Sequence, residues 1–241
     1  MPSVSSRPPV AFVIGAGPHI ANTVAHMLHE EGYLVALGSR RPSDEAEHMD
    51  KFASVVVDAA NPSSIRHAFQ TVVKEFGHPT VVIFNAASFV TPPDPSDPLS
   101  LEAEYFHDAA SMGAGVFIAA QEAVDSFRHE APSPHPKVFI VTGNTIAFEK
   151  NPNPEYLCLS IQKSIEAQLI EAFAESYQKE NFRFYFASLA SKSASVNSAE
   201  FMHSAPTHAK VYWDLIAHTT EQGSWDYRFT ADGEKYEDEE A

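Results

Sequence analysis

The sequence predicts a single-domain α/β protein with a doubly wound parallel sheet. Three observations lead to this fold class. Short, fully apolar segments alternate with helical stretches from residue 10 onward, and the first such segment runs into a glycine-rich turn. No stretch rich in Gly or Ser separates two domains, so we expect one domain over residues 1–241. With 44% hydrophobic residues, a chain of this length can bury one sizeable core.

The expected strands are apolar on both faces, which is typical of a parallel sheet that helices cover on both sides. They are Val10–Ile14, Tyr33–Leu37, Ser54–Val57, Thr80–Phe84, Val138–Thr142, Arg183–Ala187 and Trp225–Phe229. Right-handed crossovers would give a doubly wound sheet, with ligands bound at the carboxyl ends of the strands.

The segments between the strands show helical spacing of apolar residues. The expected helices are His19–Glu31, a helix starting at Asn61, 102–129, Leu157–Lys179 and His208 to about Thr220. Asn61 is a good N-cap and Pro62 suits the first helical position. Residues 188–207 are small and polar without a period, so a functional loop or lid is expected there.

Composition excludes several classes of function. The net charge of −16 opposes binding to nucleic acid or anionic membranes, and no apolar run is long enough to span a bilayer. Cys158 is the only cysteine, so no intrachain disulfide can form, and a cytoplasmic location is expected. The histidines lack ligand-like spacing with acids or cysteine, so we expect no metal site. Residues 1–8 form an N-terminal extension, and the acidic tail 231–241 is expected to be frayed and solvated.

The glycine-rich turn is the strongest functional signal. It reads Gly15-Ala16-Gly17-Pro18-His19-Ile20-Ala21, directly between a strand and a helix. Gly15 permits a tight turn, and Gly17 lets the backbone approach a pyrophosphate. The helix that starts near Ile20 would present its positive end to that group. The alternative is an ordinary strand-to-helix turn that needs glycine only for its backbone angles.

This turn resembles that of the short-chain dehydrogenase/reductase superfamily, which carries Gly-x-x-x-Gly-x-Gly. The similarity extends over roughly residues 8–230. His19 and Ala21 stand where the two later glycines of the motif fall. His19 is either a solvated loop histidine or, when protonated, a partner for the phosphates, and the sequence leaves both open.

The residues after the second strand indicate which dinucleotide binds. An acid there favours the free ribose hydroxyl of NAD, whereas basic groups suit the 2′-phosphate of NADP. This chain has Arg40 and Arg41 and no carboxylate before Asp44. Since Arg offers planar, bidentate donors for a phosphate, we expect NADP(H), the alternative being a solvated arginine pair.

Two further matches to the family follow in chain order. Asp58 ends the third strand, where family members contact the adenine. Asn85 and Ala86 belong to Asn-Ala-Ala, which resembles the family's Asn-Asn-Ala-Gly. These residues are cofactor-binding candidates, and their other reading is the capping of turns after strands.

The resemblance implies a catalytic Tyr-x-x-x-Lys pair, a serine and an asparagine. Lys163 matches the lysine, which in the family holds the nicotinamide ribose. The tyrosine position is Leu159, which has no proton to give. The serine position falls on Asn144 or Thr145, either of which could orient a substrate or simply form a turn. The asparagine position is Met112.

Tyr156 is the phenol nearest to Lys163 in the sequence. Seven helical residues would separate the two by about 10 Å along the axis, but Pro152 and Pro154 allow a non-helical approach. Tyr156 is therefore a candidate proton donor, with packing as the alternative.

These residues together suggest an NADP(H)-dependent oxidoreductase that reduces a small carbonyl or imine. Two alternatives remain open: an NADP-binding protein without redox activity, and a non-redox isomerase or cyclase on the same scaffold. The resemblance also implies a homodimer or homotetramer, formed through the two long helices at 102–129 and 157–179.

Overall fold

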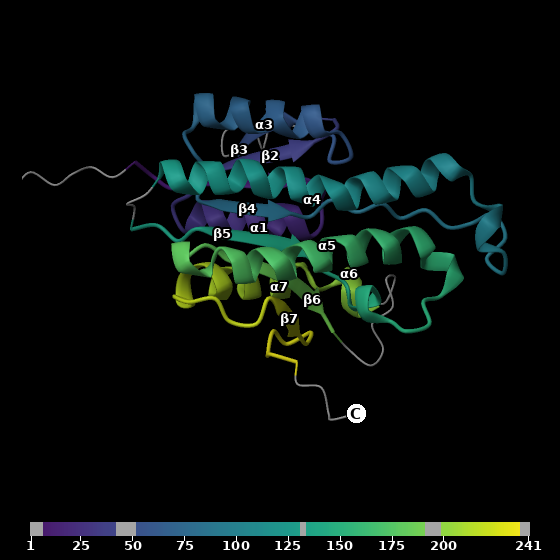
Figure 1. Cartoon of the computed structure of the whole chain (residues 1–241). Coiled ribbons are helices and arrows are strands. Elements are labelled where there is room, and N and C mark those ends of the chain that lie inside the picture. The colour runs from purple at the N-terminus through teal and green to yellow at the C-terminus, as the bar shows by residue number, and fades with distance from the viewer. Residues whose placement is uncertain (1–6, 42–51, 131–133, 191–198, 237–241) are drawn as a thin grey trace, which may run out of the picture.

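A single parallel sheet forms the centre of the molecule. The computed structural model describes residues 7–41, 52–130, 134–190 and 199–236. Within them the sheet has the order β3-β2-β1-β4-β5-β6-β7, and every pairing is parallel. The strands are β1 (Val10–Ile14), β2 (Leu34–Ser39), β3 (Phe52–Val56), β4 (Val81–Phe84), β5 (Val138–Thr142), β6 (Arg183–Leu189) and β7 (Asp226–Phe229). The predicted doubly wound α/β fold is confirmed (Figure 1).

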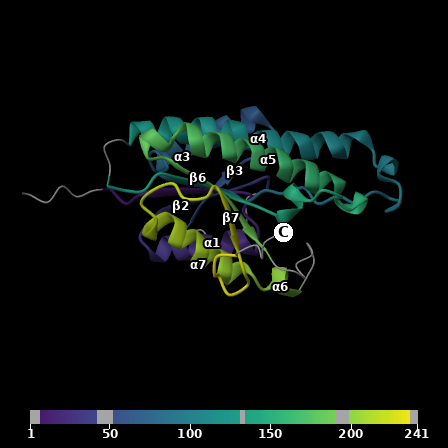
Figure 2. The ribbon, with the colours of Figure 1, turned by 60° about the horizontal axis from the view of Figure 1, so that its bottom comes forward.

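Helices cover the sheet in two layers, which Figure 2 shows above and below the strands. The helices are α1 (Ile20–Glu30), α3 (Pro62–Glu75), α4 (Ala103–His129), α5 (Leu157–Ser176), α6 (Ala199–Met202) and α7 (Ala205–Trp213). Helices α3, α4 and α5 cover one face, while α1 and α7 cover the other. The long helices α4 and α5 lie side by side and extend beyond the ends of the strands (Figure 1).

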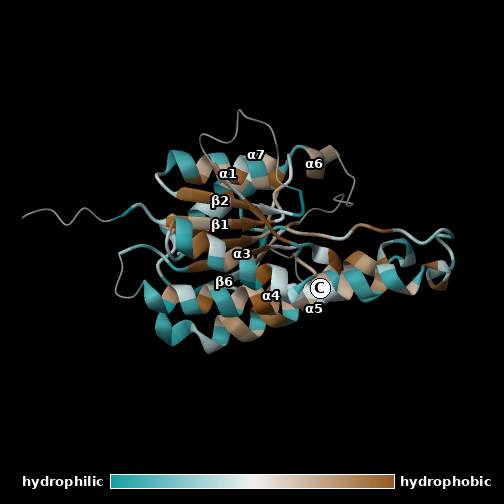
Figure 3. Cartoon of the chain, turned by 90° about the horizontal axis from the view of Figure 1, so that it is seen from above, coloured by the Kyte–Doolittle hydropathy of each residue, from teal (hydrophilic) through white to brown (hydrophobic). Residues whose placement is uncertain are grey.

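The alternation of side chains along each strand divides the core in two. Along β1, Phe12 and Ile14 pack under α3 and α4, whereas Ala11 and Val13 pack under α1. All four side chains are fully buried. Figure 3 shows the strands as hydrophobic in the middle of the molecule, between helices with a hydrophilic outer side. The apolar strands are thus explained by burial on both faces.

Helix α3 begins as the sequence predicts. The Asn61 side chain accepts hydrogen bonds from the backbone N–H groups of Ser63 (2.9 Å) and Ser64 (3.1 Å), and Pro62 occupies the first turn. This cap fixes the direction in which the chain leaves β3, directly beside Asp58.

The region predicted as an irregular stretch at 188–207 is partly regular. Strand β6 continues to Leu189, because its last residues pair with β7, with Leu189 opposite Phe229. Helix α6 lies within the stretch, and α7 starts at Ala205 rather than His208, since Pro206 suits a first helical turn. Residues 191–198 lie outside the described residues.

The helix predicted from His208 to about Thr220 is present, but it is α-helical only to Trp213. After Trp213 it passes into a wider turn at Asp214–His218. The buried Arg183 guanidinium donates to the carbonyl oxygens of Leu215 (2.7 Å) and Ile216 (3.0 Å). These bonds satisfy carbonyl groups at the helix end.

The acidic tail is partly ordered, contrary to the prediction. The Thr230 N–H donates to the Glu234 carbonyl (2.9 Å), and Gly233 adopts a φ of 81°. Lys235 then pairs with Phe229 in an antiparallel bridge. The tail turns back because β7 is an edge strand with free backbone groups to offer. Residues 237–241, and 1–6 of the extension, lie outside the described residues.

Candidate cofactor cleft and active site

Two adjoining cavities lie at the carboxyl ends of the strands, where the strand order reverses between β1 and β4. The larger has a volume of about 690 Å³ and the smaller about 310 Å³. Asn85 and Ala87 line both cavities, so the two form one continuous cleft.

The glycine-rich turn forms the floor of this cleft. Gly15 has a φ of 91°, and a Cβ there would lie 2.4 Å from the Ala86 nitrogen. A Cβ on Gly17 would meet nothing within 4 Å, so open space lies in front of this residue. No side chain caps the N-terminus of α1 among the described residues, which leaves its positive end available to an anion. Ile20, the first residue of α1, lines the smaller cavity.

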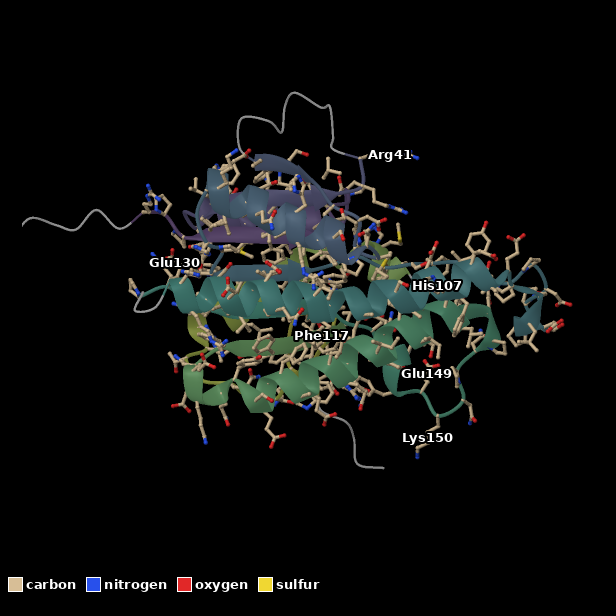
Figure 4. The ribbon with its side chains drawn as sticks, turned by 45° about the horizontal axis from the view of Figure 1, so that its top comes forward. Arg41, His107, Phe117, Glu130, Glu149 and Lys150 are labelled. Atoms are coloured by element: carbon tan, nitrogen blue, oxygen red, sulfur yellow. The ribbon has the colours of Figure 1, made fainter. Side chains whose placement is uncertain are left out.

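The larger cavity contains the residues predicted to contact the adenosine half of a dinucleotide. Arg40, Arg41 and Asp58 all line it. Both arginines are exposed, and Figure 4 shows Arg41 pointing outward at this edge of the sheet. The Asp58 carboxylate also accepts a hydrogen bond from the Ala60 N–H (3.1 Å), so it stabilises its own turn as well. Met112 lines the same cavity.

Asn85 connects three strands below the cleft. Its side-chain amide donates to the Gly15 carbonyl (3.0 Å), and its Oδ1 accepts from the Thr142 hydroxyl (2.9 Å). Thr142 in turn accepts from the buried Tyr212 hydroxyl (2.9 Å). Burial raises the pKa of Tyr212 well above its ordinary value, so this phenol stays protonated as a donor.

Lys163 belongs to a buried polar network on α5. Its Nζ donates to the Thr142 carbonyl (2.8 Å) and to Glu166 Oε2 (2.8 Å). Glu166 is completely buried, and its other oxygen accepts from Gln162 Nε2 (2.7 Å). Burial raises the pKa of Glu166, while the Lys163 ammonium opposes that rise.

Gln162 links this network by hydrogen bonds to the backbone at the wall of the cleft. Its Nε2 also donates to the Ala86 carbonyl (3.0 Å), and its Oε1 accepts from the Ser88 N–H (2.8 Å). Residues 86–88, which follow β4, are therefore fixed by a side chain of α5. Gln162 and Glu166 were not among the predicted site residues, although their spacing of one helical turn next to Lys163 was a usable signal.

The smaller cavity has apolar walls around a few polar groups. Phe89, Leu159 and Phe201 line it, together with Lys163 and Asn144. Leu159 is buried one turn before Lys163, where the resemblance to the dehydrogenases would place a tyrosine.

The two candidates after β5 differ in position. Asn144 lines the smaller cavity, and its Oδ1 accepts from the Ile146 N–H (2.9 Å), which caps a short 3₁₀ turn at Thr145–Phe148. Its amide hydrogens remain free to donate to a ligand. Thr145 starts that turn and is not among the residues that line either cavity.

Tyr156 does not lie at the cleft. It ends the 3₁₀ turn Pro154–Tyr156, and its ring packs against Phe89 with centroids 5.7 Å apart. Phe89 lines the smaller cavity, whereas Tyr156 does not. The prolines do set a non-helical approach, but it brings the phenol against the Phe89 ring. The packing alternative is the one that the geometry supports.

His19 lines the smaller cavity and also contacts α6. Its Nε2 donates to the Met202 carbonyl (2.9 Å), and its ring packs against Phe201 with centroids 5.5 Å apart. His19 thereby joins the glycine-rich turn to α6, which covers the smaller cavity with Phe201. The partner on α6 lies 183 residues further along the chain, so no local pattern could have indicated this contact.

His208 on α7 gives the fold a measurable pH dependence. Its Nδ1 donates to the Ser204 carbonyl (2.9 Å), and burial lowers its pKa to about 4. Because the folded pKa lies below the ordinary 6.5, the contribution to stability is complete above pH 6.5 and is lost as the pH falls toward 4.

We therefore expect the free energy of unfolding to fall by about 3 kcal/mol more between pH 7.5 and 4 in the unmutated protein than in His208→Gln. Urea titrations at both pH values measure the difference, in which the common carboxylate contributions cancel. Parallel pH profiles in the two proteins would contradict the expectation.

Two other findings concern the described residues only. No group of three or more His, Cys, Asp or Glu side chains is arranged to hold a metal ion. None of the described helices combines the length and apolar character needed to cross a membrane.

A doubly wound sheet with a glycine-rich turn at its switch point is the architecture of Rossmann-type, dinucleotide-binding proteins. Residues 15–191 match the family model described as enoyl-(acyl carrier protein) reductase. The chain belongs to the short-chain dehydrogenase/reductase superfamily.

Known relatives agree with this assignment. The short chain dehydrogenase/reductase dmxR12 of Cryptosporiopsis sp. (strain 8999) is 29% identical over 228 residues, which cover 90% of this chain and 89% of the relative. Among solved structures, the NADH-dependent reductase A1-R′ complexed with NAD superposes with a TM-score of 0.77 at 16% identity, over 94% and 96% of the two chains. An alcohol dehydrogenase from Thermococcus sibiricus complexed with 5-hydroxy-NADP gives 0.73 at 17%, over 95% and 99%. At these identities the two structures show the fold alone.

Proposed function

We propose that this protein is an NADP(H)-dependent reductase of a small carbonyl or imine compound. The observation that carries the proposal is the continuous cleft, which joins an arginine-lined cavity to an apolar one that contains Lys163. A dinucleotide would extend across both cavities, with one half in each.

The residues of the cleft fit the cofactor. The open space at Gly17 and the uncapped end of α1 suit a pyrophosphate. Arg40 and Arg41 suit a 2′-phosphate, since no described carboxylate other than Asp58 lines the larger cavity. When bound, NADPH supplies a hydride for the carbonyl or imine carbon.

The chain's own residues then position the substrate and exclude water. Phe201 on α6 covers the smaller cavity, while Phe89 and Leu159 form apolar walls that favour an uncharged substrate. The remaining amide hydrogens of Asn144 can donate to the substrate oxygen or nitrogen. Lys163 lies at the same cavity.

Leu159 favours a second candidate function. With no phenol at this position, the protein could bind NADP without redox activity or catalyse an isomerisation or cyclisation in the same cavity. The deciding experiment follows NADPH absorbance with benzaldehyde, acetophenone, cyclohexanone and 1-pyrroline. Stoichiometric oxidation supports the reductase, whereas tight NADPH binding without any consumption supports the second candidate.

The cofactor preference predicts a specific effect of the arginine pair. NADPH should bind more tightly than NADH, and replacing Arg40 and Arg41 by Ala should narrow the difference by about 1–2 kcal/mol because charge-assisted hydrogen bonds to the 2′-phosphate are lost. Fluorescence titration with both cofactors measures this. Arg66→Ala, which removes an exposed arginine on α3, is the control. Equal affinities in the unmutated protein would refute the NADP assignment.

A homodimer or homotetramer is proposed through α4 and α5. Phe117 on α4 is 43% exposed and lies at the outer side of these helices (Figure 4), in contact with Phe173 of α5. An apolar side chain in this position suits a two-fold contact between copies. The net charge of −16 opposes association, so added salt should strengthen it.

Light scattering should show an oligomer at micromolar concentration, and Phe117→Glu should dissociate it because a carboxylate would be buried at the contact. Leu34→Glu places the same charge at another exposed apolar residue, on β2 and not on α4 or α5, and should leave the assembly intact. A monomeric unmutated protein would rule out this assembly.

A further inference from the structure

The proposed function leaves one chemical role unassigned, which is the donor of the proton that completes the reduction. Of the described residues that line the smaller cavity, His19 and Lys163 are the only ones whose side chains can carry a titratable N–H. The Thr142 hydroxyl also lines it but donates to Asn85. The donor is therefore sought between His19 and Lys163.

The geometry separates these two. The Nε2–H of His19 is directed at the Met202 carbonyl, and the ring packs on Phe201, so this N–H is not available to a substrate. Lys163 has three N–H bonds on Nζ, and the two acceptors found among the described residues, Thr142 and Glu166, account for two of them. The third hydrogen has no described protein acceptor, and Lys163 lines the cavity.

Glu166 makes this arrangement a matched acid and counter-ion. Its carboxylate lies 2.8 Å from Nζ and is completely buried, so it holds the charged amine in place beside the cavity. Gln162 holds the other carboxylate oxygen and also binds Ala86, which fixes the pair relative to the cofactor cavity.

Resting on the proposed function, we propose that Lys163 is the proton donor of this enzyme and that Glu166 is its positioning residue. NADPH, when bound, would supply the hydride: its C–H bond would break as the new C–H bond forms on the carbonyl carbon, and the C=O π electrons would move to the oxygen. An O–H bond forms as an N–H bond of Lys163 breaks, and that electron pair remains on Nζ as a neutral amine. Solvent returns the proton to Nζ after the alcohol leaves.

The test combines loss of the amine with its chemical replacement. At saturating NADPH, with the compound from the panel that the unmutated protein reduces fastest, Lys163→Ala should lower kcat by about 10²–10⁴-fold, the usual range for general acid catalysis. Methylammonium should raise the kcat of Lys163→Ala by at least about tenfold, because Glu166 provides a site for the added cation. Lys163→Ala/Glu166→Gln, which lacks this counter-ion, should not be rescued.

A second measurement needs neither cofactor nor substrate. Methylammonium should raise the Tm of Lys163→Ala but not that of Lys163→Ala/Glu166→Gln, while ethanol should act on neither, because only a cation pairs with the buried carboxylate. Should Lys163→Ala fail to fold, Lys163→Met/Glu166→Gln keeps a neutral, volume-filled pair, and its kcat at saturating NADPH should show the same loss.

The possible failures are distinguishable. An unmutated protein that consumes no NADPH overturns the proposed function, and this inference with it. An active unmutated protein whose folded Lys163→Met/Glu166→Gln variant keeps its kcat overturns the inference alone. The inference is also overturned, with the proposed function intact, if Tyr156→Phe or His19→Gln causes the large loss instead, or if methylammonium rescues neither kcat nor Tm in a folded Lys163→Ala.

Discussion

Replacing Gly15 by Ala is expected to destabilise the protein by about 3–5 kcal/mol, the range of the most damaging single substitutions. The added Cβ would lie 2.4 Å from the backbone nitrogen of Ala86, which cannot move aside as a side-chain end could. The φ of 91° adds strain for any residue with a Cβ. Urea unfolding measures the loss.

Gly17→Ala is the matched control, two residues further along the same turn. Its Cβ would meet no atom within 4 Å, so the free energy of unfolding should change by less than about 1 kcal/mol. The methyl group would occupy the open space assigned to the pyrophosphate, so NADPH affinity should fall about tenfold or more. A large loss of stability in Gly17→Ala, or none in Gly15→Ala, would contradict this division of roles.

The second large effect is expected from breaking the buried pair on α5. Lys163→Met should lower the free energy of unfolding by about 3–5 kcal/mol, because it leaves the Glu166 carboxylate buried without its counter-ion. Adding Glu166→Gln should recover most of the loss, since the neutral amide can keep its bond to Gln162. The coupling between the two substitutions follows from unfolding free energies of both single variants and the double variant.

The sign of the pH dependence adds a second check on this pair. Without the lysine, the already raised pKa of Glu166 rises further, so folding takes up a proton that the unfolded chain has lost. The loss of unfolding free energy caused by Lys163→Met should therefore be larger at pH 8 than at pH 5. In Lys163→Met/Glu166→Gln the loss should be the same at both pH values. If Lys163→Met lost the same amount of stability at both pH values, Glu166 would not be a buried, uncompensated charge in this variant.

The sequence predicted the architecture well because the governing signals are local. Fully apolar strands, the Asn61 cap and the glycine-rich turn each follow from residues that are adjacent or one helical turn apart. Boundaries were wrong where distant pairing decides them. Strand β6 extends to Leu189 because β7 pairs with it, and the tail folds back onto Phe229 for the same reason.

Local sequence signals also predicted part of the candidate site, but not the contacts between distant elements. The cofactor-binding candidates Gly15, Gly17, Arg40 and Asp58 all meet at the cleft, since the carboxyl ends of parallel strands lie at one edge. The partner of His19 on α6 and the position of Tyr156 behind Phe89 depend on contacts between distant elements. Sequence spacing carries no information on such contacts.

Thr142, the last residue of β5, has a consequence for how this protein can evolve. Its carbonyl accepts from Lys163, and its hydroxyl links Tyr212 to Asn85, so α5, α7 and β4 share one residue. Substitutions at these positions are expected to be strongly non-additive. Evolution could therefore replace the residues of this polar network only by coordinated substitutions. The apolar side chains of Leu159 and Phe89 at the cavity wall make no polar contacts, so each can be substituted independently. New substrate specificities are therefore most accessible through the apolar walls, on top of a polar framework that changes slowly.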